Sequence, residues 1–149
     1  MHPFDIRTVA LAKHAQHVVL IHFPIAAFIT AVGFDYSAHW TKNRTLAAAA
    51  YFNLLIAAAS TIPVVLTGIA AWQWALEGQP LKGILLMHFA LGLASSALIG
   101  FVWWIHWRER RGHAAALPAY RLPIEAVAVL LVALTGHLGG FLSGVNGPG

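Results

Sequence analysis

Four long apolar segments restrict the fold of this chain more than any other feature of its sequence. They cover about residues 17–38, 46–70, 83–105 and 123–142. Each is close to the roughly 20 apolar residues that a helix needs to cross a hydrocarbon core about 30 Å thick. Inside such a core every backbone polar group must be bonded within the structure, so the segments are predicted to be helices. The sequence therefore predicts an all-α integral membrane protein, a four-helix up-and-down bundle that forms a single domain over residues 1–149.

Composition agrees with a membrane protein and excludes several kinds of site. Hydrophobic residues make up 59% of the chain and charged residues 9%, whereas a typical soluble domain has about 25% charged residues. The chain has no cysteine, which excludes disulfides, Cys-ligated zinc, iron–sulfur clusters and covalently attached c-type haem. Imidazole is the remaining soft ligand, and the chain has nine histidines. The formal charge of +4 is interpreted as loop charge that sets orientation, so the lipid bilayer and not nucleic acid is the expected partner.

The distribution of lysine and arginine predicts which side of the membrane each end of the bundle faces. Six of these cations lie in the two loops after the first and third segments: Lys42, Arg44, Arg108, Arg110, Arg111 and Arg121. The opposite side carries three, Arg7, Lys13 and Lys82. Because cytoplasmic loops carry the excess of positive charge, both termini are predicted on the outer, periplasmic side. The expected location is the bacterial inner membrane, crossed several times.

Three histidines lie at matched depth in three different segments. His22 is near the start of the first segment, His88 near the start of the third and His137 near the end of the fourth. With a rise of about 1.5 Å per residue, each lies roughly 6 to 8 Å inside the same membrane edge. Ionisable groups at such a depth are costly and mark a functional site by default. These three are the candidate cofactor ligands, and His17 at the interface is a weaker fourth.

The remaining histidines are expected to face water or lipid headgroups. They are His2, His14, His39, His106 and His113. A second haem at the far ends of the first and third segments, at His39 and His106, is not expected. The 17 residues between His22 and His39 turn these two side chains to different faces of a helix.

Small residues accompany two of the candidate ligands. In the third segment His88, Gly92, Ser96 and Gly100 recur every four residues, and in the fourth Ala126, Ala133, His137 and Gly140 form a similar stripe. Such a stripe admits a flat macrocycle or a closely packed helix. We therefore expect one haem b held by axial imidazoles. A zinc or copper ion bound by His17, His22, His88 and His137 remains an alternative, because spacing alone does not choose between them.

Several motifs of the chain resemble those of a known family. They are His17-x4-His22-Phe23-Pro24-Ile25-Ala26, Thr67-Gly68 followed by a tryptophan, His88 early in the third segment, and Thr135-Gly136-His137-Leu138-Gly139-Gly140. In these motifs the chain resembles the bacterial membrane family called domain of unknown function 2231 over nearly its whole length. The resemblance implies four spans and a shared histidine motif but no activity. In that family the last motif often reads Gly-Gly-x-Leu-Gly-Gly, so the resemblance supports the other three histidines more firmly than His137.

The leading functional hypothesis is a b-type cytochrome-like electron-transfer subunit that holds haem near the periplasmic face. It would pass electrons between a quinol pool and an outer partner as part of a larger redox complex, and the arrangement resembles transmembrane b-type cytochromes at the level of the fold. Short loops leave no room for a substrate domain, so a subunit is favoured over a self-contained enzyme. The alternatives are a cofactor-free structural or assembly subunit and a His-bound zinc or copper site. A transporter is disfavoured, because Asp35 and Glu125 both fall near the cytoplasmic edge.

Overall fold

The computed structural model describes residues 15–112 and 117–144, and the regular elements in these ranges are all α-helices. They are α2 (Ala15–Leu20), α3 (His22–Thr41), α4 (Arg44–Trp74), α5 (Gly83–Arg111) and α6 (Arg121–Leu142). Four stretches within them are long and apolar enough to cross a membrane: Gln16–Thr41, Arg44–Trp74, Gly83–Arg111 and Arg121–Leu142. The predicted all-α membrane fold is confirmed, with spans that extend a few residues beyond several of the predicted boundaries.

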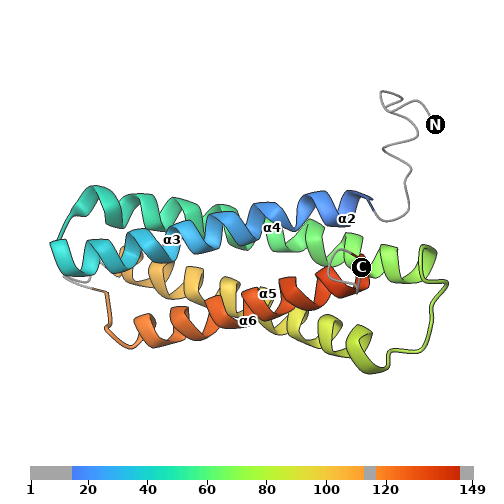
Figure 1. Cartoon of the computed structure of the whole chain (residues 1–149). Coiled ribbons are helices and arrows are strands. Elements are labelled where there is room, and N and C mark those ends of the chain that lie inside the picture. Colours follow the sequence, from blue (N-terminus) through green and yellow to red (C-terminus); the bar gives the residue numbers. More distant parts are fainter. Residues whose placement is uncertain (1–14, 113–116, 145–149) are drawn as a thin grey trace.

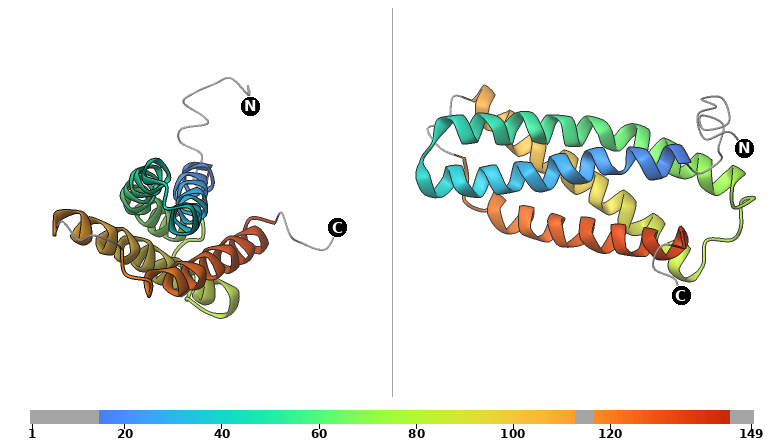
Figure 2. Two further views of the ribbon diagram at one scale, coloured as in Figure 1. Left: turned by 90° about the vertical axis from the view of Figure 1, so that its left-hand side faces the viewer. Right: turned by 45° about the horizontal axis from the view of Figure 1, so that its top comes forward.

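The helices form an up-and-down bundle of two hairpins. α3 packs mainly against α4 and α5 against α6, while contacts of α4 with α5 and of α3 with α6 close the ring. Figures 1 and 2 show α2, α3 and α4 on one side of the bundle, with α5 and α6 crossing below them. The start of α2 and the end of α6 lie at one end, which we call the terminal end (Figure 1). The other end, which carries the α3–α4 turn and the start of α6, we call the basic end. The assignment of the terminal end to the periplasmic side stays a prediction.

A proline explains why the first span is divided into two helices. Pro24 has no N–H to donate to the carbonyl oxygen of Leu20, and its ring crowds that carbonyl. α2 accordingly ends at Leu20 and α3 begins at His22. The chain does not turn away at this point, because the amide of Ile21 still donates to the carbonyl oxygen of His17 at 3.0 Å. The two helices therefore form one span with a local interruption.

The turn between α3 and α4 is closed by two residues with suitable local chemistry. Lys42 takes a left-handed conformation, φ +56°, at the end of α3. Asn43 then caps α4, and its Oδ1 accepts hydrogen bonds from the amides of Thr45 at 2.8 Å and Leu46 at 3.3 Å. These bonds satisfy donors that the first turn of a helix otherwise leaves without partners. The short turn brings α3 and α4 side by side in opposite directions.

The interior of the bundle is small, and its outer surface is apolar. The buried core cluster consists of Phe28, Ala31, Leu54, Ala57, Ile99, Val102, Ala128 and Val132. Alanines at these positions let the helices approach closely. Large apolar side chains point outward, including Leu130 at 69% exposure and Ile62 at 64%. In water such a surface would be unfavourable by about 25 cal/mol for each Å², so the outer face fits contact with lipid.

Cations and aromatic rings gather where α5 reaches the basic end. The guanidinium groups of three arginines lie over rings, Arg108 over Trp104 at 5.1 Å, Arg110 over Tyr51 at 4.2 Å and Arg111 over Trp107 at 4.5 Å. Tryptophan and tyrosine concentrate at membrane–water interfaces, and a cation over a ring face is attracted by its quadrupole. This belt indicates the membrane boundary at the basic end.

Candidate functional site

Two of the four candidate histidines face each other at the terminal end. His17 lies on α2, and His88 lies five residues after Gly83, the first residue of α5. Their ring centroids are 6.5 Å apart, and the ring planes are nearly perpendicular at 85°. Both side chains are partly buried. Helices from the two halves of the bundle therefore bring these imidazoles together, and we call them the imidazole pair.

His17 is held against α4 by its Nδ1 atom. Nδ1 lies 3.2 Å from the carbonyl oxygen of Val64 and 3.3 Å from Oγ1 of Thr67. A carbonyl oxygen only accepts, so Nδ1 carries a proton, and in the neutral imidazole Nε2 then carries the lone pair. Thr67 Oγ1 donates its own proton to Pro63 O at 2.7 Å, so its oxygen is also positioned to accept from His17. A Cβ atom on Gly68 would lie 3.0 Å from His17 Cε1, so this ring requires a glycine beneath it.

His88 is held against α6 in the same way. Its Nδ1 lies 3.0 Å from the carbonyl oxygen of Thr135, which assigns the proton to Nδ1 and the lone pair to Nε2. A Cβ atom on Gly139 would lie 3.1 Å from His88 Cε1. We call the accepting carbonyl group and the nearby glycine the seat of each histidine. In both seats the glycine follows the accepting residue by four positions, Val64 to Gly68 and Thr135 to Gly139, so carbonyl and glycine share one helix face. Each seat fixes both the tautomer and the orientation of its imidazole.

The structure does not place His22 and His137 with the imidazole pair. Both side chains are exposed. His22 Nδ1 lies 3.3 Å from the carbonyl oxygen of Val19, and the His137 ring packs edge-on against Phe141 at 5.0 Å. No three of the four candidate histidines bring ring nitrogens within 4.8 Å of one another. Of the four candidate histidines, His17 and His88 therefore form a pair, and His22 and His137 lie apart from it.

Helix rotation explains this separation. Five residues from His17 to His22 correspond to about 500°, or roughly 140° around an ideal helix, so the two side chains leave different faces. His137 lies two residues after Thr135 and two before Gly139, which is about 200° from either. Thr135 and Gly139 face His88, so His137 points to the opposite side. Gly139 near the end of α6 makes room for His88, whereas the sequence pattern associated the small residues of this segment with His137.

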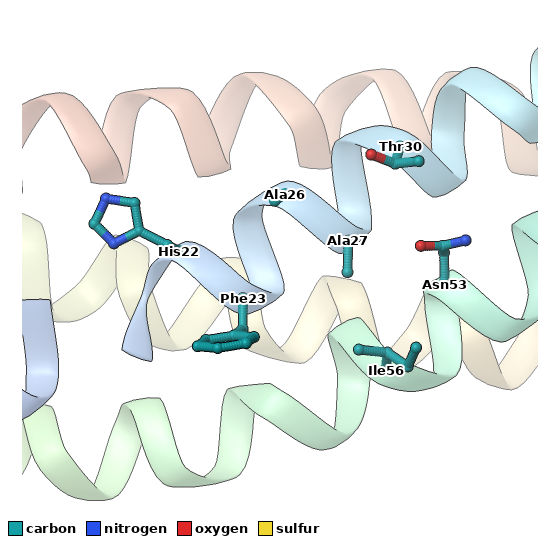
Figure 3. Close-up of a pocket in the computed structure, with 7 residues that line it drawn as sticks. All are labelled: His22, Phe23, Ala26, Ala27, Thr30, Asn53 and Ile56. Carbon is teal, nitrogen blue, oxygen red and sulfur yellow. The ribbon is translucent and has the colours of Figure 1, made fainter. Parts of the chain in front are cut away.

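His22 lies beside an open apolar groove between α3 and α4. The groove has a volume of about 430 Å³ and is lined by His22, Phe23, Ala26, Ala27, Thr30, Asn53 and Ile56. In Figure 3 His22 stands at one end of this row, apart from the side chains that face α4. One of the two Nδ2 hydrogens of Asn53 is used by the carbonyl oxygen of Ala49, at 2.9 Å. An open apolar groove on the outside of the bundle suits a lipid chain better than a polar ligand.

A second polar group, which we call the buried quartet, lies near the basic end. It consists of Asp35 on α3, His106 on α5, and Arg121 and Glu125 on α6, all with exposures of 3% or less. Arg121 donates to both carboxylate oxygens of Asp35, from Nε at 2.7 Å and from Nη2 at 3.3 Å. His106 Nε2 lies 3.2 Å from Glu125 Oε1. Four ionisable side chains are thus enclosed by three helices.

The buried quartet was missed in the sequence. His106 was assigned to water or headgroups, and this was wrong, because its exposure is 1%. A signal was present: Asp35, His106 and Glu125 all lie within a few residues of the same predicted membrane edge. The depth comparison that singled out the terminal-end histidines would have found this set too if carboxylates had been included. Polar groups buried at such depth need hydrogen-bonding or charged partners, and here the four side chains of the quartet serve as partners for one another.

The comparisons with known proteins agree with the membrane fold. A family model described as "Predicted membrane protein (DUF2231)" matches residues 13–147. This confirms the resemblance that the sequence motifs indicated. Neither a curated protein nor a solved structure shows significant similarity to the chain.

Proposed function

The chain belongs to the DUF2231 family of predicted membrane proteins, and we propose that it is a b-type cytochrome-like electron-transfer subunit in which His17 and His88 are the axial ligands of one haem b. One observation carries this proposal: two imidazoles on separate helices face each other, each with Nδ1 committed to a backbone carbonyl. Metal-bound histidines commonly use the second ring nitrogen in this way, which fixes the tautomer and makes the ligating nitrogen more basic. Because Nδ1 is the nitrogen that meets the carbonyl oxygen in both residues, ligation would use Nε2.

The spacing of the rings fits two ligands on opposite sides of one metal. Two imidazole–metal bonds of about 2 Å each, plus the offset of each nitrogen from its ring centre, put the centroids roughly 6 Å apart. The observed separation is 6.5 Å. The donor chemistry also fits, because the chain has no cysteine and haem b is commonly held by neutral imidazoles. The described residues therefore fit the cofactor that the sequence favoured.

Haem is favoured over zinc or copper by the number of ligands. A zinc site usually has four ligands, or three plus a water. The candidate histidines converge as two, and His22 and His137 stand apart. Haem supplies its own four equatorial nitrogens and requires from the protein only axial ligands. A paired set of imidazoles therefore supports the macrocycle better than a bare ion.

Two protein ligands also favour electron transfer over catalysis on a substrate. Metal centres that act on substrates keep one coordination position open, and the imidazole pair would fill both axial positions. Haem supplies one-electron redox chemistry when it is bound. The chain's own contribution would be to hold the imidazoles, set their basicity through Val64 O and Thr135 O and keep water away with its apolar surroundings. The proposed partners are other membrane or periplasmic redox subunits and a quinone.

The proposal is tested by the visible spectrum of the whole protein, purified in detergent, in its oxidised and dithionite-reduced forms. We expect a sharp alpha band and a shifted Soret band on reduction, with one iron per chain. Elemental analysis of the same sample would show iron and no stoichiometric zinc or copper. A colourless protein that also fails to take up added haemin would contradict the proposal. In that case the histidines tie helices together in a structural subunit.

Substitution of Gly139 by alanine tests whether the seat of His88 matters. The new Cβ would lie 3.1 Å from His88 Cε1, so the imidazole must shift. We expect at least a tenfold loss in haem affinity, in the range seen when groups that orient a ligand are removed. Gly100→Ala is the matched control, because nothing lies within 4 Å of its new Cβ. Haem titration of both variants is the measurement, and equal affinities would show that the seat has no influence on binding.

A further inference from the structure

In the Asp35–Arg121 half of the buried quartet, the two charges cancel and the charged atoms have hydrogen-bond partners. Besides its two bonds to Asp35, Arg121 donates from Nη1 to the carbonyl oxygens of Leu117 at 3.3 Å and Pro118 at 3.0 Å. All three guanidinium nitrogens are therefore used, and both carboxylate oxygens accept. The charges of this ion pair cancel. Arg121 thus has little capacity left to neutralise a further carboxylate.

In the His106–Glu125 half, one carboxylate oxygen has no hydrogen-bond partner among the described residues. The side-chain exposures of His106 and Glu125 are 2% and 0%. Glu125 Oε1 lies 3.2 Å from His106 Nε2, but Glu125 Oε2 is buried and has no hydrogen-bond partner in the described part of the chain. A buried carboxylate with one oxygen unsatisfied and a neutral imidazole beside it would carry a net charge of −1 away from water. Isolated charges are not tolerated in that environment.

The surrounding ionisable groups do not remove this charge. From α3, Asp35 is bound to Arg121, and Tyr36 donates its hydroxyl to Leu122 O at 2.7 Å. Among the described residues, the charged groups that act on Glu125 are His106, Asp35 and Arg121, and none of these lies on α4. With His106 neutral, the quartet has two carboxylates and one guanidinium, which leaves one uncompensated negative charge.

We infer that His106 and Glu125 form an internal proton-binding site, which holds one proton between the imidazole and the carboxyl group while the chain is folded. The proton resides either on Glu125, as a carboxylic acid beside a neutral imidazole, or on His106, as an imidazolium paired with a carboxylate. Both forms make the quartet neutral and provide the hydrogen between Nε2 and Oε1. This site lies at the opposite end of the bundle from the imidazole pair (Figure 1) and does not depend on haem.

A metal ion fits the same place less well. Asp35, His106 and Glu125 each place a potential ligand atom within 4.8 Å of the others. A dication among them would lie beside the Arg121 guanidinium, which already holds both oxygens of Asp35. It would also change the buried net charge from −1 to +1 instead of cancelling it. A single proton gives neutrality, so it is the favoured ligand.

A bound proton makes stability depend on pH. Above about pH 8, where ordinary glutamate is ionised and ordinary histidine is neutral, an unfolded chain binds almost no titratable proton at these two side chains, whereas the folded pair holds one. The folded state then binds more protons than the unfolded state, so stability must fall as pH rises. The ratio of folded to unfolded protein should fall by up to about tenfold per pH unit until the folded pair releases its proton. Glu125→Gln, which keeps the shape of the side chain, should remove this dependence.

The decisive experiment determines the protonation of both groups in the whole protein at pH 7.5 in detergent. We expect one of two results: an infrared carbonyl band of a carboxylic acid that disappears in Glu125→Gln, or a ¹⁵N-histidine spectrum in which both ring nitrogens of His106 are protonated. Glu109→Gln is the matched control, because Glu109 pairs with Arg108 at the surface. His106→Gln leaves the carboxyl group as the only place for the proton, so the infrared band must be present in that variant. A neutral His106 together with an ionised Glu125 would overturn the inference, and stoichiometric zinc in that sample would assign the site to a metal ion instead.

Discussion

Replacement of His88 by alanine should abolish stable haem binding while the bundle remains folded. His88 is one of the two imidazoles that face each other in the described part of the chain, and its removal would leave His17 as the remaining ligand of this pair. Changes in groups that merely orient a ligand cost about 10- to 100-fold in affinity, so loss of the ligand itself should exceed 100-fold. His17→Ala should have the same effect from the other side. Haem content per chain after purification, with helicity measured by circular dichroism, checks both variants.

His137→Ala is the matched control for this experiment. It removes an imidazole at similar depth on α6, but that side chain is exposed and packs against Phe141. It should retain haem with an unchanged reduced spectrum. Free imidazole added to His88→Ala should restore part of the binding, because the space left by the ring admits it. If His137→Ala and His88→Ala lost haem equally, or if neither lost it, the assignment of the axial ligands would be wrong.

Replacement of Asp35 by asparagine should strongly destabilise the bundle. Arg121 would then lose the carboxylate to which it donates two hydrogen bonds, and breaking a buried ion pair from one side costs about 3–5 kcal/mol. Glu109→Gln, which removes the partner of Arg108 at the surface, should cost no more than about 1 kcal/mol. Thermal unfolding of both variants in the same detergent is the measurement.

A second substitution separates charge from packing in this prediction. The double variant Asp35→Leu with Arg121→Met removes both charges and keeps apolar volume, so it should recover much of the stability lost in Asp35→Asn. Equal stabilities of the wild type and Asp35→Asn would show that the pair does not hold α3 to α6. The outcome also bears on the terminal end, because α6 carries Thr135 and Gly139, which contact His88.

The architecture could be predicted from the sequence because a bilayer leaves few choices. Segments of span length must be helical, and short connections must place consecutive helices antiparallel. The boundaries moved outward in the structure, for example from 105 to Arg111 in α5, because arginine and tryptophan side chains extend a helix through the interface. The position of His88 near the start of a long apolar helix was predicted for the same reason, because it follows directly from the sequence.

The direction in which each histidine side chain points was harder to predict, because it depends on the rotation of the helix about its own axis. The interruption before Pro24 and the packing of α2 on Gly68 decide that His17, and not His22, faces His88. His17, the weaker candidate in the sequence analysis, is thus one of the imidazole pair. The glycine stripe of the third segment was also only partly informative, because a Cβ on Gly100 would touch nothing within 4 Å. The glycines that decide the site lie on the neighbouring helices, which no periodicity within one segment reveals.

The electron paramagnetic resonance spectrum of the oxidised protein tests the central proposal most directly. If His17 and His88 held haem iron with their planes at the observed 85°, they would act about equally on two perpendicular iron orbitals and would leave these close in energy. The proposal therefore predicts a low-spin ferric signal with a strongly anisotropic g tensor, absent from both His17→Ala and His88→Ala. A high-spin signal in the wild type, or a low-spin signal that survives either substitution, would contradict ligation of haem by this pair of histidines.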